Sequence, residues 1–171
     1  MGETLPPQWR RNLIQVVPMV ITLALIMLGA APAQSSAAVP VTPMLALMSI
    51  YYWSVYRPEW LSAPVVFFLG VIADCLLGGP LGLNAILYLF AYGITTSQRL
   101  ILQSRPFPIA WLAFGMVTVT CTALSWAIGC LFYGNLFDPL PFAVQALLTI
   151  LLFPLVARAF IWTEVRLARL A

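Results

Sequence analysis

The fold is decided by the stretch FFLGVIADCLLGGPLGLN, residues Phe67 to Asn84. It predicts a hydrophobic helix, a very tight turn at Gly78-Gly79-Pro80 and the start of a second hydrophobic helix. Asp74 is the only acidic residue of the chain that lies well within an apolar run. A charge in the middle of a membrane span costs about 2.5–3.5 kcal/mol on insertion scales. Other groups of the protein must therefore compensate for Asp74.

The composition is that of an integral membrane protein. Of 171 residues, 63% are hydrophobic and 8% are charged, and the mean hydropathy is +0.99. A soluble domain is about half apolar and a quarter charged. The sequence contains no histidine and no lysine, and the lack of histidine argues against a histidine metal site and a histidine general base. With so little soluble surface, the net charge of +3 does not indicate nucleic-acid binding. No cofactor is expected.

Six apolar segments predict an all-α integral membrane protein with six transmembrane helices in a single domain over residues 1–171. Each segment approaches or reaches the length that a bilayer requires. A cleaved signal peptide is the alternative for the first segment, because Arg10-Arg11 precedes it and Ala31-Pro32-Ala33 follows it. That segment is long for a signal peptide, so we expect it to be retained. The predicted spans cover about residues 13–31, 41–56, 61–77, 81–97, 109–133 and 141–162.

The arginines predict the orientation. If the chain crosses the membrane six times, all eight arginines lie on the side of the membrane that also holds the two termini. The opposite side then carries only Asp138. Because cytoplasmic loops are enriched in basic residues, both termini are expected in the cytoplasm. Five tryptophans are predicted at the same interface as an aromatic belt: Trp9, Trp53, Trp60, Trp111 and Trp162.

Small and polar residues mark the faces on which membrane helices pack. In the third span, Gly70, Asp74 and Gly78 share one face, and Asn84 and Tyr88 share a face of the fourth. The fifth span carries a continuous seam of small residues. We expect ordinary helix packing there, and packing against a partner's transmembrane helix is the alternative. The seam consists of Gly115, Thr118, Thr122, Ser125 and Gly129.

Several groups could compensate for Asp74. The first turn of the helix after Pro80 has backbone N–H groups without acceptors, and these or the Asn84 amide lie within reach of the carboxylate. Contact with a partner or ligand, proton- or ion-coupled transport, and catalysis are the other interpretations. An enzyme is the weakest of them, because the sequence has no nucleophile–base pair or paired carboxylates. The cysteines at 75, 121 and 130 are expected to be small buried hydrophobic residues.

The same residues resemble the signature of the rod shape-determining protein MreD family of bacteria. The pattern is G-x-x-x-D from Gly70 to Asp74, then G-x-P-x-G from Gly78 through Pro80 to Gly82, then an aromatic residue at Tyr88. Tyr52-Trp53 and the exit Arg57-Pro58 in the preceding segment fit as well. The recognisable motifs lie between about residues 40 and 98. The resemblance suggests a structural hairpin, with a possible partner contact, built from Gly70, Asp74, Gly78, Pro80, Gly82, Asn84 and Tyr88.

The resemblance implies a non-enzymatic scaffold subunit of the cell-elongation machinery in the bacterial inner membrane. Such a subunit binds the membrane-anchored periplasmic protein MreC and helps to couple the actin-like MreB to peptidoglycan synthesis by RodA and a penicillin-binding transpeptidase. The family's fold is similar to that of the substrate-binding subunits of energy-coupling-factor transporters. That similarity supplies the alternative function, a small-molecule-binding membrane subunit of such a transporter.

Overall fold

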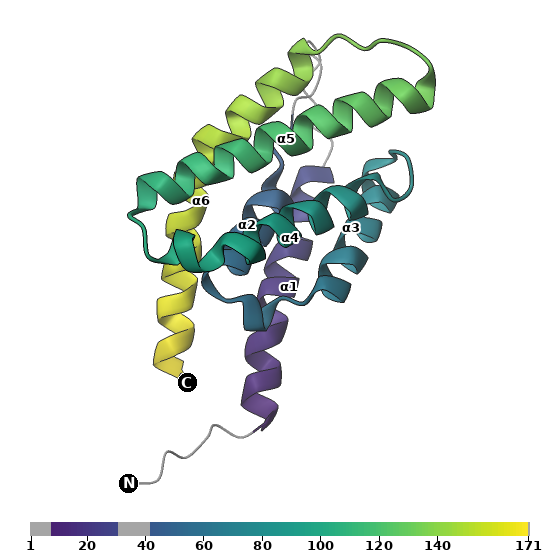
Figure 1. The fold of residues 1–171 in the computed structure, drawn as a ribbon. Coiled ribbons are helices and arrows are strands. Elements are labelled where there is room, and N and C mark those ends of the chain that lie inside the picture. The colour runs from purple at the N-terminus through teal and green to yellow at the C-terminus, as the bar shows by residue number, and fades with distance from the viewer. Residues whose placement is uncertain (1–7, 31–41, 171) are drawn as a thin grey trace, which may run out of the picture.

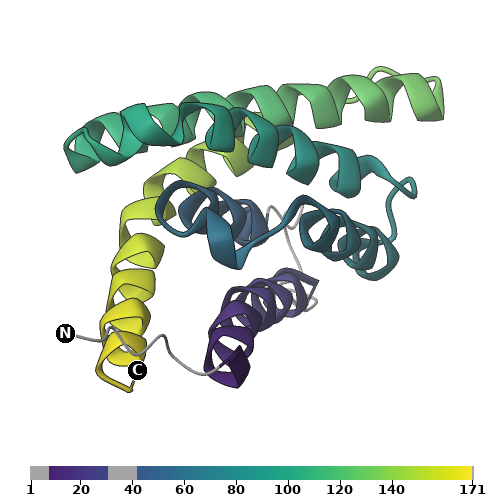
Figure 2. The ribbon, with the colours of Figure 1, turned by 60° about the horizontal axis from the view of Figure 1, so that its bottom comes forward.

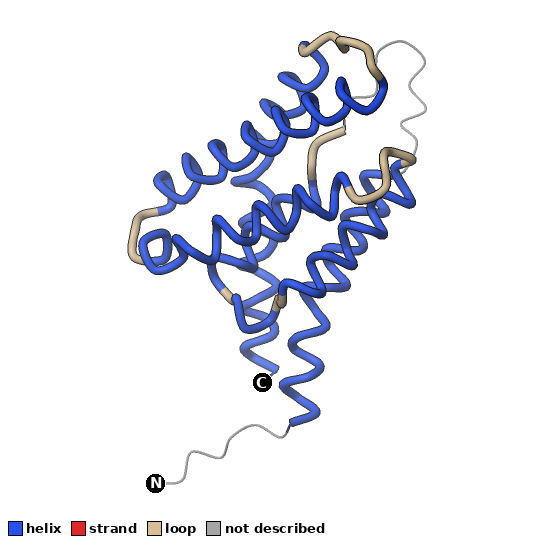
Figure 3. Tube along the Cα trace, turned by 45° about the vertical axis from the view of Figure 1, so that its right-hand side comes forward, coloured by secondary structure: helices blue, strands red, loops and turns tan. Residues whose placement is uncertain are grey.

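The computed structural model describes residues 8–30 and 42–170, with side chains for 16–30 and 42–165. These residues form helices joined by short connections, without a strand among them (Figures 1 and 3). The first residues of α1 and the last residues of α6 lie at the same end of the molecule (Figure 1). The helices are α1 (Gln8–Ala30), α2 (Leu45–Tyr56), α3 (Ala63–Leu77), α4 (Leu83–Gln103), α5 (Phe107–Tyr133) and α6 (Leu140–Leu170), with a 3₁₀ turn η1 (Pro58–Trp60).

Helix α2 is the centre of the bundle. Ten of its 12 residues are buried, and it packs against α1, α4 and α6. It is apolar on all sides, which is the pattern of a helix enclosed by other helices. Trp53 is fully buried there, so its ring faces other helices and not the lipid, whereas Trp162 is exposed.

Three helices are long and apolar enough to cross a membrane: Leu83–Gln103, Phe107–Tyr133 and Leu140–Val165. Helix α3 (Ala63–Leu77) is apolar but shorter, and the part of α1 with described side chains, Val16–Ala30, is apolar as well. Helix α2 is only about 18 Å long at 1.5 Å per residue, although the predicted second span covers 41–56. The prediction of an all-helical membrane protein is confirmed, and the count of six crossings stays a prediction.

Two helices extend beyond the apolar segments that predicted them. The fourth predicted span ends at residue 97, whereas α4 continues to Gln103. Buried Leu102 holds this last turn against the core, and the Gln103 side chain donates to the carbonyl of Val55. Helix α6 likewise continues from the predicted end at 162 to Leu170. Hydropathy marks the apolar segment, and the backbone hydrogen bonds of a helix do not stop where that segment stops.

Helix α6 changes direction at Pro154 (Figure 2). A proline has no N–H, so the carbonyl four residues earlier, at Ile150, loses its helical partner. The indole Nε1 of Trp111 on α5 donates to that carbonyl at 2.9 Å. The bend lets the first part of α6 follow α5, while Phe160 beyond the bend packs its ring on Tyr52 of α2, with centroids 5.1 Å apart.

Polar side chains fasten α2 to its neighbours. Thr22 of α1 and Ser49 of α2 share a hydrogen bond of 2.7 Å, and the Tyr51 hydroxyl donates to the carbonyl of Ala110 at 2.8 Å. At the start of α2, the Met44 N–H donates to Thr149 Oγ1 of α6 at 3.0 Å. Apolar helices gain no hydrophobic free energy by associating in lipid, so such bonds and close packing hold a membrane bundle together.

We expect Trp111→Phe to lower the free energy of unfolding by about 1–3 kcal/mol, because the partly buried carbonyl of Ile150 loses its donor. In a Pro154→Ala background the new N–H of residue 154 can bond that carbonyl, so the same substitution should cost less. Denaturant unfolding in detergent of the two single variants and the double variant measures this coupling. An equal cost of Trp111→Phe in both backgrounds would contradict this role of the indole.

Candidate functional site

The chain reverses direction between α3 and α4 within residues 78–82. Gly78 ends α3 in the left-handed conformation, with φ 70°, and Gly82 precedes α4 with φ 96°. Residues with a side chain rarely adopt these angles, so two glycines permit the short turn. Pro80 lies between them, and its carbonyl accepts from the Leu83 N–H at 3.2 Å. The hairpin therefore has the glycine and proline positions of the G-x-P-x-G pattern at its turn.

The Asp74 carboxylate lies against the first residues of α4. Asp74 is 1% exposed. Oδ2 accepts from the Gly82 N–H at 2.8 Å and from the Ala85 N–H at 3.5 Å. Oδ1 accepts from the N–H of Asn84 at 2.8 Å and from its side-chain Nδ2 at 3.0 Å. Both carboxylate oxygens are thus bonded to donors of the next helix.

This arrangement makes Asp74 the N-terminal cap of α4, supplied by the preceding helix. The first N–H groups of a helix have no partners within it, and the positive end of its dipole favours an anion. Among the described side chains no arginine forms an ion pair with Asp74; the ion pairs there involve Arg57. The charge of Asp74 is therefore compensated by backbone donors of the hairpin itself, which is one of the interpretations offered by the sequence. Both oxygens of the carboxylate are engaged within the hairpin, so Asp74 has a structural role there.

Gly70 brings α3 into backbone contact with α4. A Cβ atom built on Gly70 would lie 2.3 Å from Cα and 2.7 Å from N of Ala85, which is inside van der Waals contact. The absent side chain sets the distance between the helices, and this distance puts Asp74 within reach of the first turn of α4. Tyr88, one turn after Asn84, is 6% exposed and belongs to the hydrophobic core. All predicted hairpin residues thus lie in the α3–α4 hairpin.

The predicted seam of α5 divides into two parts. Gly115 faces Ile150 of α6, since a Cβ there would lie 3.7 Å from its side chain. Thr118 and Thr122 are buried, and each hydroxyl donates to the carbonyl four residues before it. Ser125 is only partly buried, and a Cβ on Gly129 would meet no atom within 4 Å. The first part packs within the bundle, while the second stands clear of the described residues.

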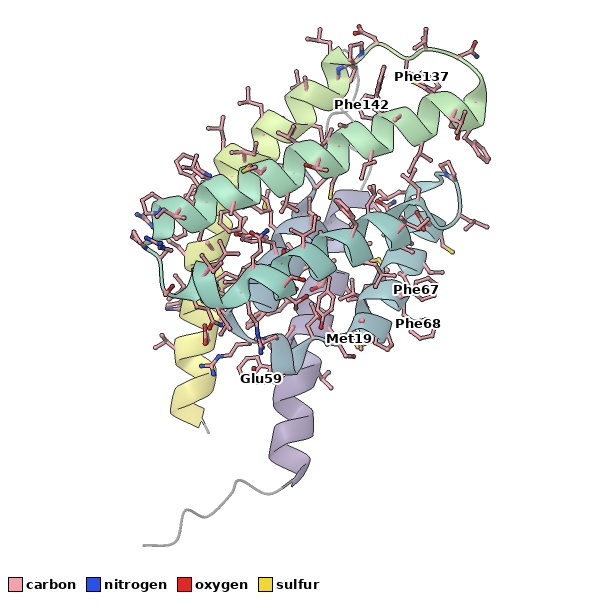
Figure 4. All side chains as sticks on the ribbon, viewed as in Figure 1. Met19, Glu59, Phe67, Phe68, Phe137 and Phe142 are labelled. Atoms are coloured by element: carbon pink, nitrogen blue, oxygen red, sulfur yellow. The ribbon has the colours of Figure 1, made fainter. Side chains whose placement is uncertain are left out.

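A polar cluster that the sequence did not single out joins α2, η1 and α6 at the end of the molecule near the termini. Arg57 Nε lies 2.7 Å from Glu164 Oε1, and the Tyr52 hydroxyl donates to the other oxygen at 3.1 Å. Arg57 also stacks over the Trp60 ring, 5.2 Å from its centroid, beside Glu59, which Figure 4 labels. In the sequence, the available signal for this cluster was Glu164, the one acidic residue near the basic C-terminal end. Its partner lies 107 residues away, so spacing could not reveal the pair.

The cysteines differ from the prediction. Cys121 is buried, but Cys75 is exposed and Cys130 is partly buried, and all three are free. Cys75 follows Asp74 directly, so the helix turns it away from α4. Among the described residues, no three His, Cys, Asp or Glu side chains are placed to hold a metal ion.

Gly70→Ala should lower the free energy of unfolding by about 1–3 kcal/mol, because the new methyl group displaces the backbone at Ala85. Gly93→Ala is the matched control, since a Cβ at Gly93 meets no atom within 4 Å. There the better helix propensity of alanine should stabilise the protein by up to about 1 kcal/mol. Denaturant unfolding of both variants tests this contrast. Equal effects would show that the close approach of α3 and α4 does not matter for stability.

We expect Asp74→Asn to cost about 3 kcal/mol of stability, because an amide nitrogen then faces backbone N–H donors in place of an acceptor. Asp138→Asn is the control: this exposed aspartate accepts from the Leu140 N–H at 3.0 Å, and asparagine caps a helix equally well. Asp74→Ala should also destabilise the protein but leave membrane insertion intact, since alanine enters a span more easily. Unfolding and membrane-fraction assays measure both effects. If the Asp74→Asn variant were as stable as the wild type, the carboxylate would have no capping role in stability.

Comparison with known proteins places the whole bundle in one family. The family model for the rod shape-determining protein MreD matches residues 10–161, which run from the first turn of α1 into the last third of α6 and include the Asp74 hairpin. Neither the curated proteins nor the solved structures contain a significant match to the chain. The family is one of membrane proteins, in keeping with the three long apolar helices. The chain therefore belongs to the MreD family of rod shape-determining proteins.

Proposed function

We propose that this protein is a non-enzymatic scaffold subunit of the cell-elongation complex in the bacterial inner membrane. In this proposal it binds the membrane-anchored periplasmic protein MreC and helps to couple MreB to peptidoglycan synthesis by RodA and a penicillin-binding transpeptidase. The family match over residues 10–161 carries the proposal, because it supports a role in rod-shape determination. The finer steps rest on the resemblance of the hairpin and on the physical character of the bundle.

The proposed mechanism is recognition between helices within the bilayer. Most polar side chains of the described core bond to the protein itself, although the indole nitrogen of buried Trp53 has no partner there. Asp74 caps α4, Ser49 bonds Thr22, and Thr149 accepts from the Met44 N–H. The surface that remains for lateral partners is therefore mostly apolar. Association on such a surface depends on close packing of complementary shapes, since apolar burial is worth little in lipid.

We further propose six membrane crossings with both termini in the cytoplasm. The support is the distribution of arginines, all of which fall on one side when the six helices alternate in direction. The ends of α1 and α6 on one side of the molecule agree with this arrangement (Figure 1). Helix α2 would form the second crossing inside the bundle, shielded from lipid by α1, α4 and α6.

The alternative, a small-molecule-binding subunit of a transporter, has no support from the comparisons. It requires a polar cavity that opens outward. The larger hollows along α5 and α6 are lined mainly by apolar side chains, including Val119, Trp126 and Ile150.

Depletion of the protein should turn rod-shaped cells round, and the MreC homologue of the same cell should co-purify with the tagged chain. Microscopy of depleted cells and affinity purification from detergent-solubilised membranes measure the two outcomes. Re-expression of the wild-type chain, but not of the Gly70→Ala variant at a temperature that unfolds it, should restore rods. Normal cell shape after depletion would overturn the proposed function.

A further inference from the structure

A small cleft with polar groups lies between α4 and α5, in the half of these helices that adjoins their connection. It has a volume of about 160 Å³, close to the cavity of about 150 Å³ that holds a benzene molecule in another protein. Tyr51 of α2 and Leu102 of α4 border it. Its other polar residues are Thr95 and Gln98 of α4 and Thr120 of α5. The larger hollows along α5 and α6 lack such a set of polar groups.

The hydroxyl groups around the cleft have already donated their protons within the protein. The Tyr51 hydroxyl donates to the carbonyl of Ala110 at 2.8 Å. Thr95 and Thr120 each donate to the carbonyl four residues earlier in their own helix, at 2.6 Å and 2.8 Å. A hydroxyl has one proton and two lone pairs, so each of these oxygens still accepts a hydrogen bond. A molecule that enters the cleft therefore meets acceptors and must itself bring donors.

Two polar side chains at the cleft are exposed and have no partner among the described residues. Gln98 borders the cleft with an amide that offers donors as well as an acceptor. Arg99 lies one turn after Thr95 on the same side of α4, and the described ion pairs involve Arg57 instead. Among the described residues, no Asp or Glu borders the cleft. The cleft therefore suits a ligand that brings negative charge to Arg99 and uncharged donors to the interior.

An exposed apolar surface of α5 adjoins the cleft. Met116 borders the cleft and is 74% exposed, and Leu112, one turn earlier on the same side of α5, is 68% exposed. Lipid tails cover such side chains in a membrane protein. A lipid whose tails lie on this part of α5 therefore has its headgroup within reach of the cleft. The apolar surface and the polar cleft together fit one phospholipid molecule.

We propose that the α4–α5 cleft binds the headgroup of one phosphatidylglycerol molecule. The glycerol hydroxyls donate to the oxygens of Thr95 and Tyr51, and the Gln98 amide donates to a glycerol oxygen. The phosphate pairs with Arg99, since a guanidinium matches two phosphate oxygens, and the tails lie against Met116. An ethanolamine headgroup would bury an ammonium group with no carboxylate beside it, and a choline headgroup has no N–H or O–H to donate. This inference goes beyond the proposed function and requires only that the chain is embedded in a membrane.

The test is native mass spectrometry of the full chain with phosphatidylglycerol, phosphatidylethanolamine and phosphatidylcholine that carry identical acyl chains. The wild type should retain one phosphatidylglycerol, bound about tenfold more tightly than either other lipid, which corresponds to about 1.4 kcal/mol. Thr95→Val and Gln98→Leu should each reduce this preference, because they remove groups that bond the glycerol. Arg99→Gln should instead weaken the binding of all three lipids, because all three carry the phosphate.

Each variant has a matched control outside the cleft. Thr96→Val makes the same change one residue later, where the hydroxyl donates to the carbonyl of Tyr92, and Arg158→Gln removes an exposed arginine of α6. Ala113→Leu fills the cleft, while Ala123→Leu makes the same change elsewhere on α5. The controls should bind the three lipids as the wild type does. The thermal midpoint of each variant checks that it folds.

Equal affinity of the wild type for the three lipids would overturn the inference, and this outcome depends on no variant. An unchanged preference for phosphatidylglycerol in both Thr95→Val and Ala113→Leu would overturn it as well, because the lipid would then bind elsewhere. Neither result bears on the co-purification of MreC, which tests the proposed function separately.

Discussion

The hydrogen bonds from the Asp74 carboxylate to the first turn of α4 are the constraint on which the hairpin depends. A carboxylate in an apolar helix is costly, and unpartnered N–H groups at a helix start in a membrane are costly as well. Here each satisfies the other, at 2.8 Å for the two shortest backbone bonds. The match requires α3 and α4 to approach closely, which the missing side chain of Gly70 permits at Ala85. Charge, turn and helix spacing therefore form one unit.

The same principle operates at two other places in the bundle, where a distant side chain bonds a backbone group that a helix leaves free. Pro154 frees the carbonyl of Ile150, and Trp111 of α5 bonds it. Helix α2 begins inside the protein, and Thr149 of α6 accepts its preceding N–H. Because α6 bends, one part of it accompanies α5 while the other part holds α2 through Phe160 and Glu164. Helix α6 thus packs on α5 with its first part and on the central helix α2 with its second part.

These internal bonds bear on function because they leave few polar groups for an external ligand. A membrane protein whose polar atoms are satisfied within the fold recognises partners by the shape of its outer surface. In the proposed function, the Asp74 hairpin fixes the scaffold, and partners pack on its outer surface.

The sequence by itself determined the class of protein, and it predicted the donors of the next helix as one of several partners for Asp74, because these inferences depend on composition or on residues within about 12 positions of each other. It did not determine which apolar segment lies at the centre. Lipid and protein core are both apolar, so hydropathy cannot distinguish buried α2 from a lipid-facing span, and it placed Cys75 in the core. Only the tertiary structure decided the Arg57–Glu164 pair, the bond from Trp111 to Ile150 and the division of the α5 seam. These depend on contacts between helices far apart in the chain, and the spacing of residues along one helix carries no information about them.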